Sequence, residues 1–474
     1  MSKRGLHEHP SSEKKEHETN MINWKRVKRS TIGLVPVLAL SLALSGCGGS
    51  GEAGETPPAG TGEKTQETKP KAEDPASVKG EVVWQYPNTT WPEPEIKNMI
   101  ADFNKTYPNV TVKPVLGPLE PMIAAGNPPN VATNNRLEAN WIMDGMFEEL
   151  TPYIKRDPDY KPETLFHQVL YEIPQFEKGQ YGIPMYSNPT YALVVNNKIM
   201  NQYGEKSIPN LQGLKDTDEF YKKFWIMKNG EYEMTGENPL FYYGNLSGLF
   251  FVSYLNGADP STFWNPETKK VNFNDPKIVD ALDWLAKFNL DTINQPAYTK
   301  LKGQLPKNTH PFLAEKQAMM IITSNNLKDF RKAKPDLDLT VLPAPQASLW
   351  NGGSNLAIVK AGKDKDAAWA FIKWMTSTEQ GSESLYTRLG LLSPMKSSKY
   401  LEEKAKTDAD LKVFLDINGK AKKWIPQFPV AYDTEYKKLF PDFLAGKVTA
   451  KEMMDHVNKE VQKRIDEFYA SKKK

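Results

Sequence analysis

Residues 181–200 read YGIPMYSNPTYALVVNNKIM, and this stretch decides how we divide the chain. Two short apolar segments, 181–184 and 191–195, flank a polar loop at residues 186–189. Apolar runs separated by turn-forming residues are typical of a strand, a loop and a second strand. A loop that carries aromatic and amide side chains between two buried strands suits ligand contact, although an ordinary surface hairpin has the same pattern. We interpret it as the place where two halves of the protein meet.

A secretory signal precedes the folded part of the chain. Basic residues after Met21 are followed by an apolar segment at 32–44 and then by Leu44-Ser45-Gly46-Cys47. This order is typical of a signal peptide, and the apolar segment is too short to span a membrane. Translation starts at Met1 or at Met21. Residues 44–47 resemble the lipobox of bacterial lipoproteins, which implies removal of residues 1–46 and attachment of fatty acids such as palmitate to Cys47. We therefore expect a lipid anchor on the outer face of the cytoplasmic membrane, in a Gram-positive bacterium.

Composition restricts the function classes. Cys47 is the only cysteine, so no intrachain disulfide and no thiolate zinc cluster can form. Residues 47–79 are rich in Gly, Pro, Glu, Lys and Thr, which predicts a disordered tether. Without residues 1–46, 53 basic residues face 54 acidic ones, so no charge excess indicates nucleic-acid binding. The remaining part, residues 80–474, is too long for one ordinary core and suits two domains.

Strands alternate with helices from residue 80 onward. Apolar strand-like runs at 81–86, 110–115 and 130–132 are separated by segments with helical periodicity, which predicts a mostly parallel sheet with helices on its faces. Ligands bind beyond the carboxyl ends of the strands in such sheets. We expect the loops at 84–91 and 134–135 to emerge there.

The second half of the chain begins with strands and ends with helices. The continuous apolar run at 318–322 predicts a buried strand that opens into the polar loop 323–326. Helices then dominate, and capping boxes are predicted at Thr376/Glu379 and Thr449/Glu452.

These segments resemble the family 1 extracellular solute-binding proteins of bacterial ABC importers, the group that includes maltodextrin-binding proteins. The resemblance spans nearly all of residues 80–469. It is carried by five motifs in sequence: AAGNPPNV at 124–131, GMFEELTPYI at 145–154, YGIP at 181–184 leading to VNN at 195–197, EKQAM at 315–319, and DAAWAFI at 366–372.

The resemblance implies an α/β, periplasmic-binding-protein-like fold. Two α/β lobes are joined by a hinge that the chain crosses more than once, and the ligand is enclosed between them. By this resemblance, lobe one comprises residues 80–189 and 345–392, and lobe two comprises residues 190–344 and 393–474. The implied partners are a small-molecule solute and the ABC permease subunits in the membrane, and we expect the protein to be a monomer.

Sugar binding requires flat apolar faces for the C–H side of a pyranose and planar polar groups that bridge its hydroxyls. The cleft-side loops of both lobes supply such side chains. Our ligand-binding candidates from lobe one are Trp84, Tyr86, Asn134, Asn135, Tyr186, Trp350, Asn351, Gly352 and Gly353, and those from lobe two are Asn245, Asn325, Asn326 and Tyr432. For Trp84 and Trp350, packing in the core or at its rim explains the aromatic side chain as well as ligand contact does. For Tyr432, packing is favoured over ligand contact. The amides at strand ends could also cap helices.

The leading hypothesis is a lipid-anchored receptor that closes on an oligosaccharide or other carbohydrate and delivers it to an ABC permease. No metal-ligand spacing, phosphate loop or nucleophile elbow occurs, so we predict no cofactor, no metal and no enzymatic activity. Three alternatives stay open. The protein could be an extracellular carbohydrate-active enzyme, a binding protein for a non-sugar solute, or a surface sensor or adhesin without a transport role.

Overall fold

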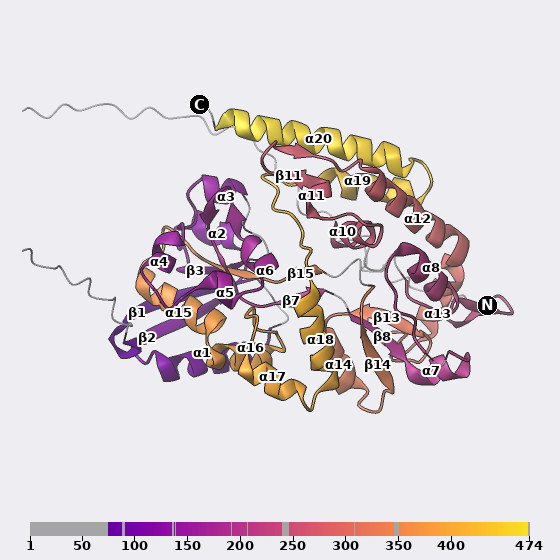
Figure 1. Ribbon diagram of the computed structural model, residues 1–474, viewed down its shortest axis with the longest axis horizontal. Helices are drawn as coiled ribbons and strands as arrows, with labels where there is room; N and C mark the ends of the chain where they lie inside the picture. The colour runs from indigo at the N-terminus through magenta and orange to yellow at the C-terminus, as the bar shows by residue number, and fades with distance from the viewer. Residues whose placement is uncertain are drawn as a thin grey trace, which may run out of the picture. The chain divides into compact units, whose positions relative to one another are not determined.

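The computed structural model describes residues 74–87, 91–134, 137, 139–190, 192–205, 207–238, 246–307, 309–345 and 350–472 (Figure 1). Residues 68–474 form one compact unit. The predicted signal peptide, the lipobox and Cys47 lie outside the described residues. No described helix is both long enough and apolar enough to cross a membrane.

Lobe one is built on a five-stranded sheet with the order β2-β1-β3-β16-β6. β1 pairs in parallel with β2 and β3, whereas β16 pairs antiparallel with β3 and β6. β16 therefore runs against the other four strands, and the predicted mostly parallel sheet is right apart from this one strand. The elements of this lobe are η1 (Pro75–Ser77), β1 (Gly80–Tyr86), α1 (Glu93–Thr106), β2 (Val110–Leu116), α2 (Leu119–Ala124), β3 (Val131–Asn134), α3 (Ala139–Met143), α4 (Thr151–Lys155), α5 (Pro162–Leu165), α6 (Gln168–Glu172), β4 (Gln175–Phe176), β5 (Gly179–Gln180), β6 (Ile183–Pro184), β16 (Asn355–Ile358), α15 (Lys365–Ser377) and α16 (Glu379–Leu389).

Helical periodicity determines which faces of the lobe-one helices are buried. In α1 the buried residues Ile96, Met99 and Phe103 recur at helical spacing, so one stripe of the helix faces the core. The Phe103 ring meets the Trp374 ring of α15 edge-on, with 5.5 Å between centroids. Val78 is also buried in this core, which corrects the predicted tether. Lobe one therefore includes Val78, because this apolar side chain packs in its core.

Lobe two is built on a smaller, antiparallel sheet with the order β13-β8-β14. All four residues of β13 are buried, as the continuous apolar run predicts. The elements of this lobe are β8 (Ala192–Asn196), α7 (Asn197–Gln202), α8 (Leu214–Lys222), β9 (Ile226–Lys228), β10 (Glu231–Met234), α10 (Leu246–Leu255), α11 (Pro260–Phe263), β11 (Trp264–Asn265), β12 (Lys270–Val271), α12 (Pro276–Thr292), α13 (Gln295–Gln304), β13 (Met319–Ile322), α14 (Ser324–Ala333), β14 (Leu339–Pro343), α17 (Lys399–Ala405), α18 (Ala409–Lys420), α19 (Asp433–Leu444) and α20 (Ala450–Ser471). The predicted α/β class with two lobes is confirmed.

The chain passes between the lobes through a two-stranded ribbon. β7 (Asn188–Thr190) leads from β6 to β8, and β15 (Trp350–Gly352) leads from β14 to β16; the two strands pair antiparallel. A third passage follows α16. Leu392, assigned to lobe one from the sequence, packs in the lobe-two core, and Met395, assigned to lobe two, packs in the lobe-one core.

Candidate functional site

One edge of the lobe-one sheet gathers the ends of four strands. β1 and β3 run in parallel, so both end at this edge, and Asn134 at the end of β3 pairs with Asn355 at the start of β16. Asn355 also pairs with Pro184 at the end of β6. The segments around Tyr86, Asn134 and Tyr186 therefore emerge at one edge, as the topology predicts.

Aromatic side chains at this edge stack on one another. Trp91 lies parallel to Tyr86, with 6.1 Å between ring centroids, and edge-on to Tyr186 at 6.2 Å. Tyr86 is 4 % exposed and Trp84 has no exposed surface. The Trp84 indole instead donates a hydrogen bond to Thr133 at 2.7 Å. A ligand could reach Trp84 only if the core moved, so the structure supports the packing interpretation for this residue.

Tyr186 and Asn134 are the half-buried candidates of this edge. The Tyr186 hydroxyl accepts a hydrogen bond from the Ser354 hydroxyl at 3.2 Å. Burial raises the Tyr186 pKa, and the hydrogen bond with Ser354 opposes that rise. Ligand contact by Tyr186 and Asn134 stays a prediction.

A buried polar cluster, the crossover network, lies where the chain passes between the lobes. It consists of Ser187, Asn351 and Asn418, each no more than 3 % exposed. The Ser187 hydroxyl donates to Asn418 Oδ1 at 2.6 Å, and Asn351 Nδ2 donates to the Ser187 hydroxyl at 2.9 Å and also to Asn418 Oδ1. Asn351 was a ligand candidate from the sequence. Its side-chain amide instead forms hydrogen bonds that connect the passages between the lobes. Buried polar groups that satisfy one another in this way specify a single local geometry.

The two candidate glycines differ in their surroundings. Gly353 has φ +143°, and a Cβ at this position would lie 2.0 Å from the Tyr186 carbonyl oxygen. A Cβ on half-buried Gly352 would meet no atom within 4 Å. Gly353 therefore lies close to the backbone of the other passage, whereas Gly352 has no such close contact.

Two of the lobe-two candidates have described side chains, and they differ in burial. Tyr432 is 2 % exposed and packs against Phe428, with 4.3 Å between ring centroids, so core packing, favoured from the sequence, is its observed environment. Asn326 is exposed on α14. Asn135 and Asn245 lie outside the described residues, as do the side chains of Asn325 and Trp350.

The segment at 421–428, which we call the strap, connects the crossover network to lobe two. The backbone N–H of Asn351 donates a hydrogen bond to the backbone carbonyl of Lys423 at 2.9 Å. The Tyr254 hydroxyl donates to the Trp424 carbonyl at 2.6 Å, and Lys423 Nζ donates to the Ala258 carbonyl at 2.7 Å. These bonds fix the backbone that carries the Trp424 side chain. Further along the strap, the Gln427 side-chain amide donates to the carbonyl of Leu137 in lobe one.

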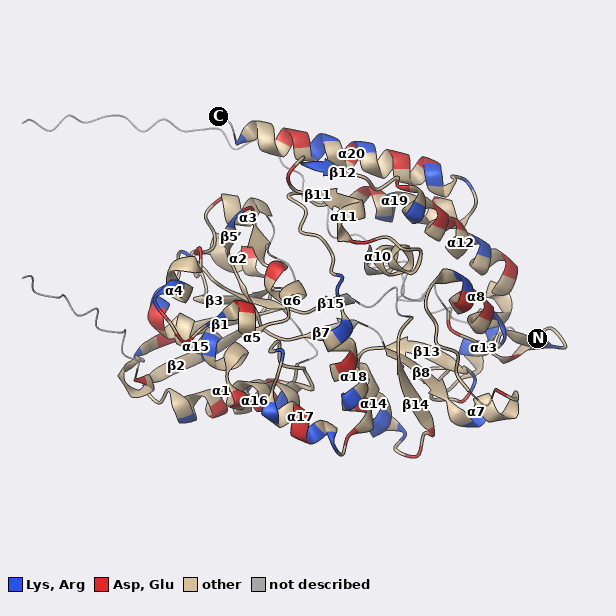
Figure 2. Cartoon of the chain, in the orientation of Figure 1, with Lys and Arg blue, Asp and Glu red and all other residues tan. Residues whose placement is uncertain are grey.

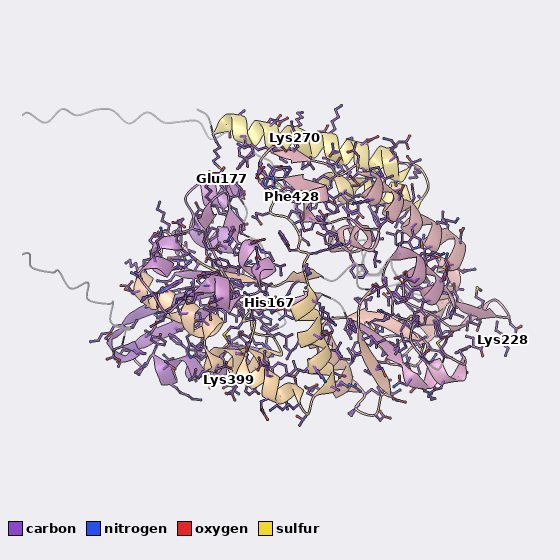
Figure 3. The ribbon with its side chains drawn as sticks, viewed as in Figure 1. His167, Glu177, Lys228, Lys270, Lys399 and Phe428 are labelled. Atoms are coloured by element: carbon purple, nitrogen blue, oxygen red, sulfur yellow. The ribbon has the colours of Figure 1, made fainter. Side chains whose placement is uncertain are left out.

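A cavity of about 1030 Å³ lies between the strap and lobe one. Its walls come from the β4–β5 hairpin, α11, the β11–β12 hairpin, the strap and the end of α20. The lining side chains are aromatic (Phe176, Trp264, Trp424, Tyr469), amide (Gln175, Gln427), acidic (Glu172, Glu177, Asp259, Glu267), basic (Lys178, Lys269, Lys422), hydroxyl (Ser261) and proline (Pro260, Pro266, Pro426). Figure 3 labels Glu177 at the tip of the β4–β5 hairpin and Phe428 at the end of the strap.

The charged groups of the cavity largely offset one another, since four carboxylates face three lysines. Burial disfavours the charged form of Asp259, but hydrogen bonds from Ser261 and Thr262 outweigh this effect and lower its pKa. The Asp259 carboxylate also caps α11. Burial raises the Tyr469 pKa, and Glu177 raises it further. The cavity combines ring faces with planar amides and has little net charge.

None of the predicted site residues whose side chains the structure describes lines this cavity. Trp264 lies in the two-residue strand β11, and Trp424 and Gln427 lie in the strap, so all three belong to segments too short to show a clear periodicity. One sequence feature could have indicated Trp424 as a site residue. It follows the polar pair Lys422-Lys423 and directly precedes a proline-containing loop. Among the described residues, no cluster of three or more His, Cys, Asp or Glu side chains could hold a metal ion.

Residues 89–382 match the family model described as bacterial extracellular solute-binding protein. Solved structures with the same fold include the ABC substrate-binding protein Lmo0181 from Listeria monocytogenes in complex with cycloalternan. It is 19 % identical with a TM-score of 0.66, and the alignment covers 82 % of this chain and 99 % of that one.

Two further structures are similar. The sugar-binding protein MalE from Xanthomonas citri is 19 % identical with a TM-score of 0.64, over 83 % of this chain and 98 % of that one. CpMnBP1 with mannobiose bound is 20 % identical with a TM-score of 0.62, over 80 % of this chain and 99 % of that one. At this level of identity the likeness establishes the two-lobe fold.

Proposed function

Because the chain belongs to the bacterial extracellular solute-binding protein family, we propose that it is a receptor that binds a neutral saccharide in the cavity between the strap and lobe one. The single observation that carries the ligand class is the lining of this cavity. Four aromatic side chains and two amides surround a space of about 1030 Å³.

The chemistry of the lining suits a sugar better than an ion or a peptide terminus. Aromatic faces such as that of Trp424 contact the C–H side of a pyranose, and amides such as that of Gln427 exchange two hydrogen bonds with neighbouring hydroxyls. The nearly balanced charge does not favour a strongly charged ligand. The similar proteins solved with cycloalternan and mannobiose support the same ligand class.

The receptor acts at the membrane in this proposal. Cys47, the last residue of the lipobox-like stretch, carries a lipid anchor, and the following residues tether the lobes to the outer face of the cytoplasmic membrane. An ABC permease receives the saccharide from the closed form. Replacing Cys47 with Ala should move the protein from the membrane fraction into the medium, and retention in the membrane would argue against this anchor.

Isothermal titration against mannobiose, maltose, maltotetraose and cycloalternan tests the ligand class. Replacing Trp424 with Ala should weaken binding of the preferred sugar by about 10-fold or more, because a central aromatic contact is lost. Trp284→Ala is the matched control, since Trp284 is half-buried on α12 and lies outside the cavity. Saturable binding of a peptide or ferric ion without any response to sugars would overturn the proposal.

Chromatography after prolonged incubation separates a receptor from a carbohydrate-active enzyme. We expect the bound saccharide to be recovered unchanged. Hydrolysis products that disappear when Glu172 or Glu267 is replaced with Gln would instead establish an enzyme.

A further inference from the structure

The orientation of α20 is set by lobe two. A capping box between Thr449 and Glu452 starts this helix, and its buried face, which includes Met453, Val457 and Val461, packs in the lobe-two core. Figure 1 shows α20 running beside α12 and α19, and Figure 2 shows acidic and basic residues alternating along it. The helix is therefore a rigid part of lobe two with a solvated outer face.

The last turn of α20 contacts lobe one. Phe468 packs against an apolar cluster that includes Ile142, Phe147 and Phe176. The other described members of this cluster lie between Leu119 and Val359 in the sequence, so Phe468 is its only described member from the C-terminal helix.

An ion pair lies beside this contact. Lys472 Nζ is 3.3 Å from Asp144 Oδ1, in the segment after α3. Its ammonium also lies 5.7 Å from the centroid of the Phe468 ring. An apolar contact from the last turn of α20 and an ion pair from the residue that follows it thus connect this end of the helix to lobe one.

This turn also carries a wall of the cavity. The Tyr469 ring lies edge-on to Phe468, with 5.2 Å between centroids. Lys269 Nζ lies 3.7 Å from the centroid of the Tyr469 ring. Tyr469 and Lys269 both line the cavity, whereas Phe468 and Lys472 do not. The placement of Tyr469 therefore depends in part on Phe468, which does not line the cavity.

We propose that Phe468 and Lys472 are positioning residues that form a C-terminal latch. They hold the end of α20 against lobe one, keep Tyr469 at the cavity and favour the closed arrangement before ligand arrives. The effect on ligand affinity rests on the function proposed above, whereas the effect on the ligand-free protein does not.

The two contacts contribute unequally. Asp144 has 67 % of its side chain exposed, and exposed ion pairs add little. Phe468 removes apolar surface from water and contributes more. We expect Phe468→Ala to raise the dissociation rate of the preferred saccharide by about 5-fold to 10-fold, and Lys472→Ala by about 2-fold, with little change in the association rate.

Amide hydrogen exchange and small-angle scattering of the full chain without ligand give the decisive measurement. In Phe468→Ala we expect faster exchange at residues 139–147 and a larger radius of gyration. Leu439→Ala is the matched control, because Leu439 is a partly buried apolar residue that packs against the lobe-two core. The latch is refuted if Phe468→Ala and Leu439→Ala behave alike in the ligand-free protein.

A charge exchange between Asp144 and Lys472 gives a second test with surface residues. Asp144→Lys and Lys472→Asp should each speed exchange at residues 139–147, and the double variant should restore slow exchange. Equal exchange in all three variants and the native chain would contradict a latch that includes the ion pair. Failure of every saccharide to bind would reject the proposed ligand class, and the ligand-free exchange would still decide the latch.

Discussion

Replacing Glu237 with Gln should remove a pH-dependent loss of stability. Glu237 is 2 % exposed, and its Oε2 accepts a hydrogen bond from the Ile321 N–H of β13 at 3.0 Å. Burial raises the pKa of this carboxyl to about 8, and the hydrogen bond from Ile321 opposes the rise only in part. Within the part of the chain that the structure describes, no lysine or arginine forms an ion pair with it. Tyr298 is the other titratable group affected, since its pKa is raised by burial and also by Glu237.

The magnitude follows from the two pKa values. An unfolded chain ionises Glu237 near 4.5 and the folded protein near 8, and each unit of difference corresponds to about 1.4 kcal/mol. The stability linked to this group is therefore complete below pH 4.5 and is lost as the pH rises to 8, by about 5 kcal/mol in total. Gln keeps the acceptor for Ile321 but does not ionise. The variant should match the native protein within about 1 kcal/mol at pH 5 and exceed it by about 3 to 5 kcal/mol at pH 8.5.

Urea unfolding followed by tryptophan fluorescence from pH 5 to pH 9 measures this difference. Glu219→Gln, at an exposed position on α8, is the control and should run parallel to the native protein. If the Glu237→Gln curve also runs parallel to the native curve across this range, the carboxyl is not held neutral by burial and the reasoning is wrong.

Three further predictions concern single elements. Gly353→Ala should lower the free energy of unfolding by about 2 to 4 kcal/mol in urea titrations, because its Cβ would collide with the Tyr186 carbonyl. Gly352→Ala should change it by less than about 1 kcal/mol, and equal losses in the two variants would contradict the contact. Asn418→Ala should cost about 1 to 3 kcal/mol, since it leaves buried partners unsatisfied, and an unchanged calorimetric midpoint would show that the crossover network adds nothing. Thr449→Ala should cost about 1 kcal/mol by losing the cap of α20, with a matching fall in helix content on heating, and no fall would exclude the cap.

Local sequence signals predicted much of the fold. The run at 318–322 becomes β13, and the predicted capping box at Thr449/Glu452 is confirmed at the start of α20. The box predicted at Thr376/Glu379 is wrong, because α15 continues to Ser377 and Thr378 caps α16 instead. A capping pattern identifies residues that can start a helix. It does not exclude that a similar residue two positions later, here Thr378, starts the helix instead.

The candidate site was harder to predict because burial depends on distant partners. Trp84 and Tyr86 precede a loop at the ligand-facing edge, yet Trp84 packs against Phe371 of α15, with 5.3 Å between ring centroids. Conversely, Trp424 lines the cavity because Tyr254 and Asn351, far away in sequence, fix the strap around it. Periodicity reports which face of an element is apolar, but it does not report which distant segment covers that face.

The order of strands in lobe one has a consequence for folding during synthesis. β16 lies between β3 and β6, but its residues follow the whole first segment of lobe two. The growing chain therefore exposes the unpaired edges of β3 and β6 until β16 has been made. Contacts between such distant segments slow folding and lengthen the life of partly folded chains. An interior strand supplied late therefore delays completion of the lobe-one sheet until the first segment of lobe two has been made.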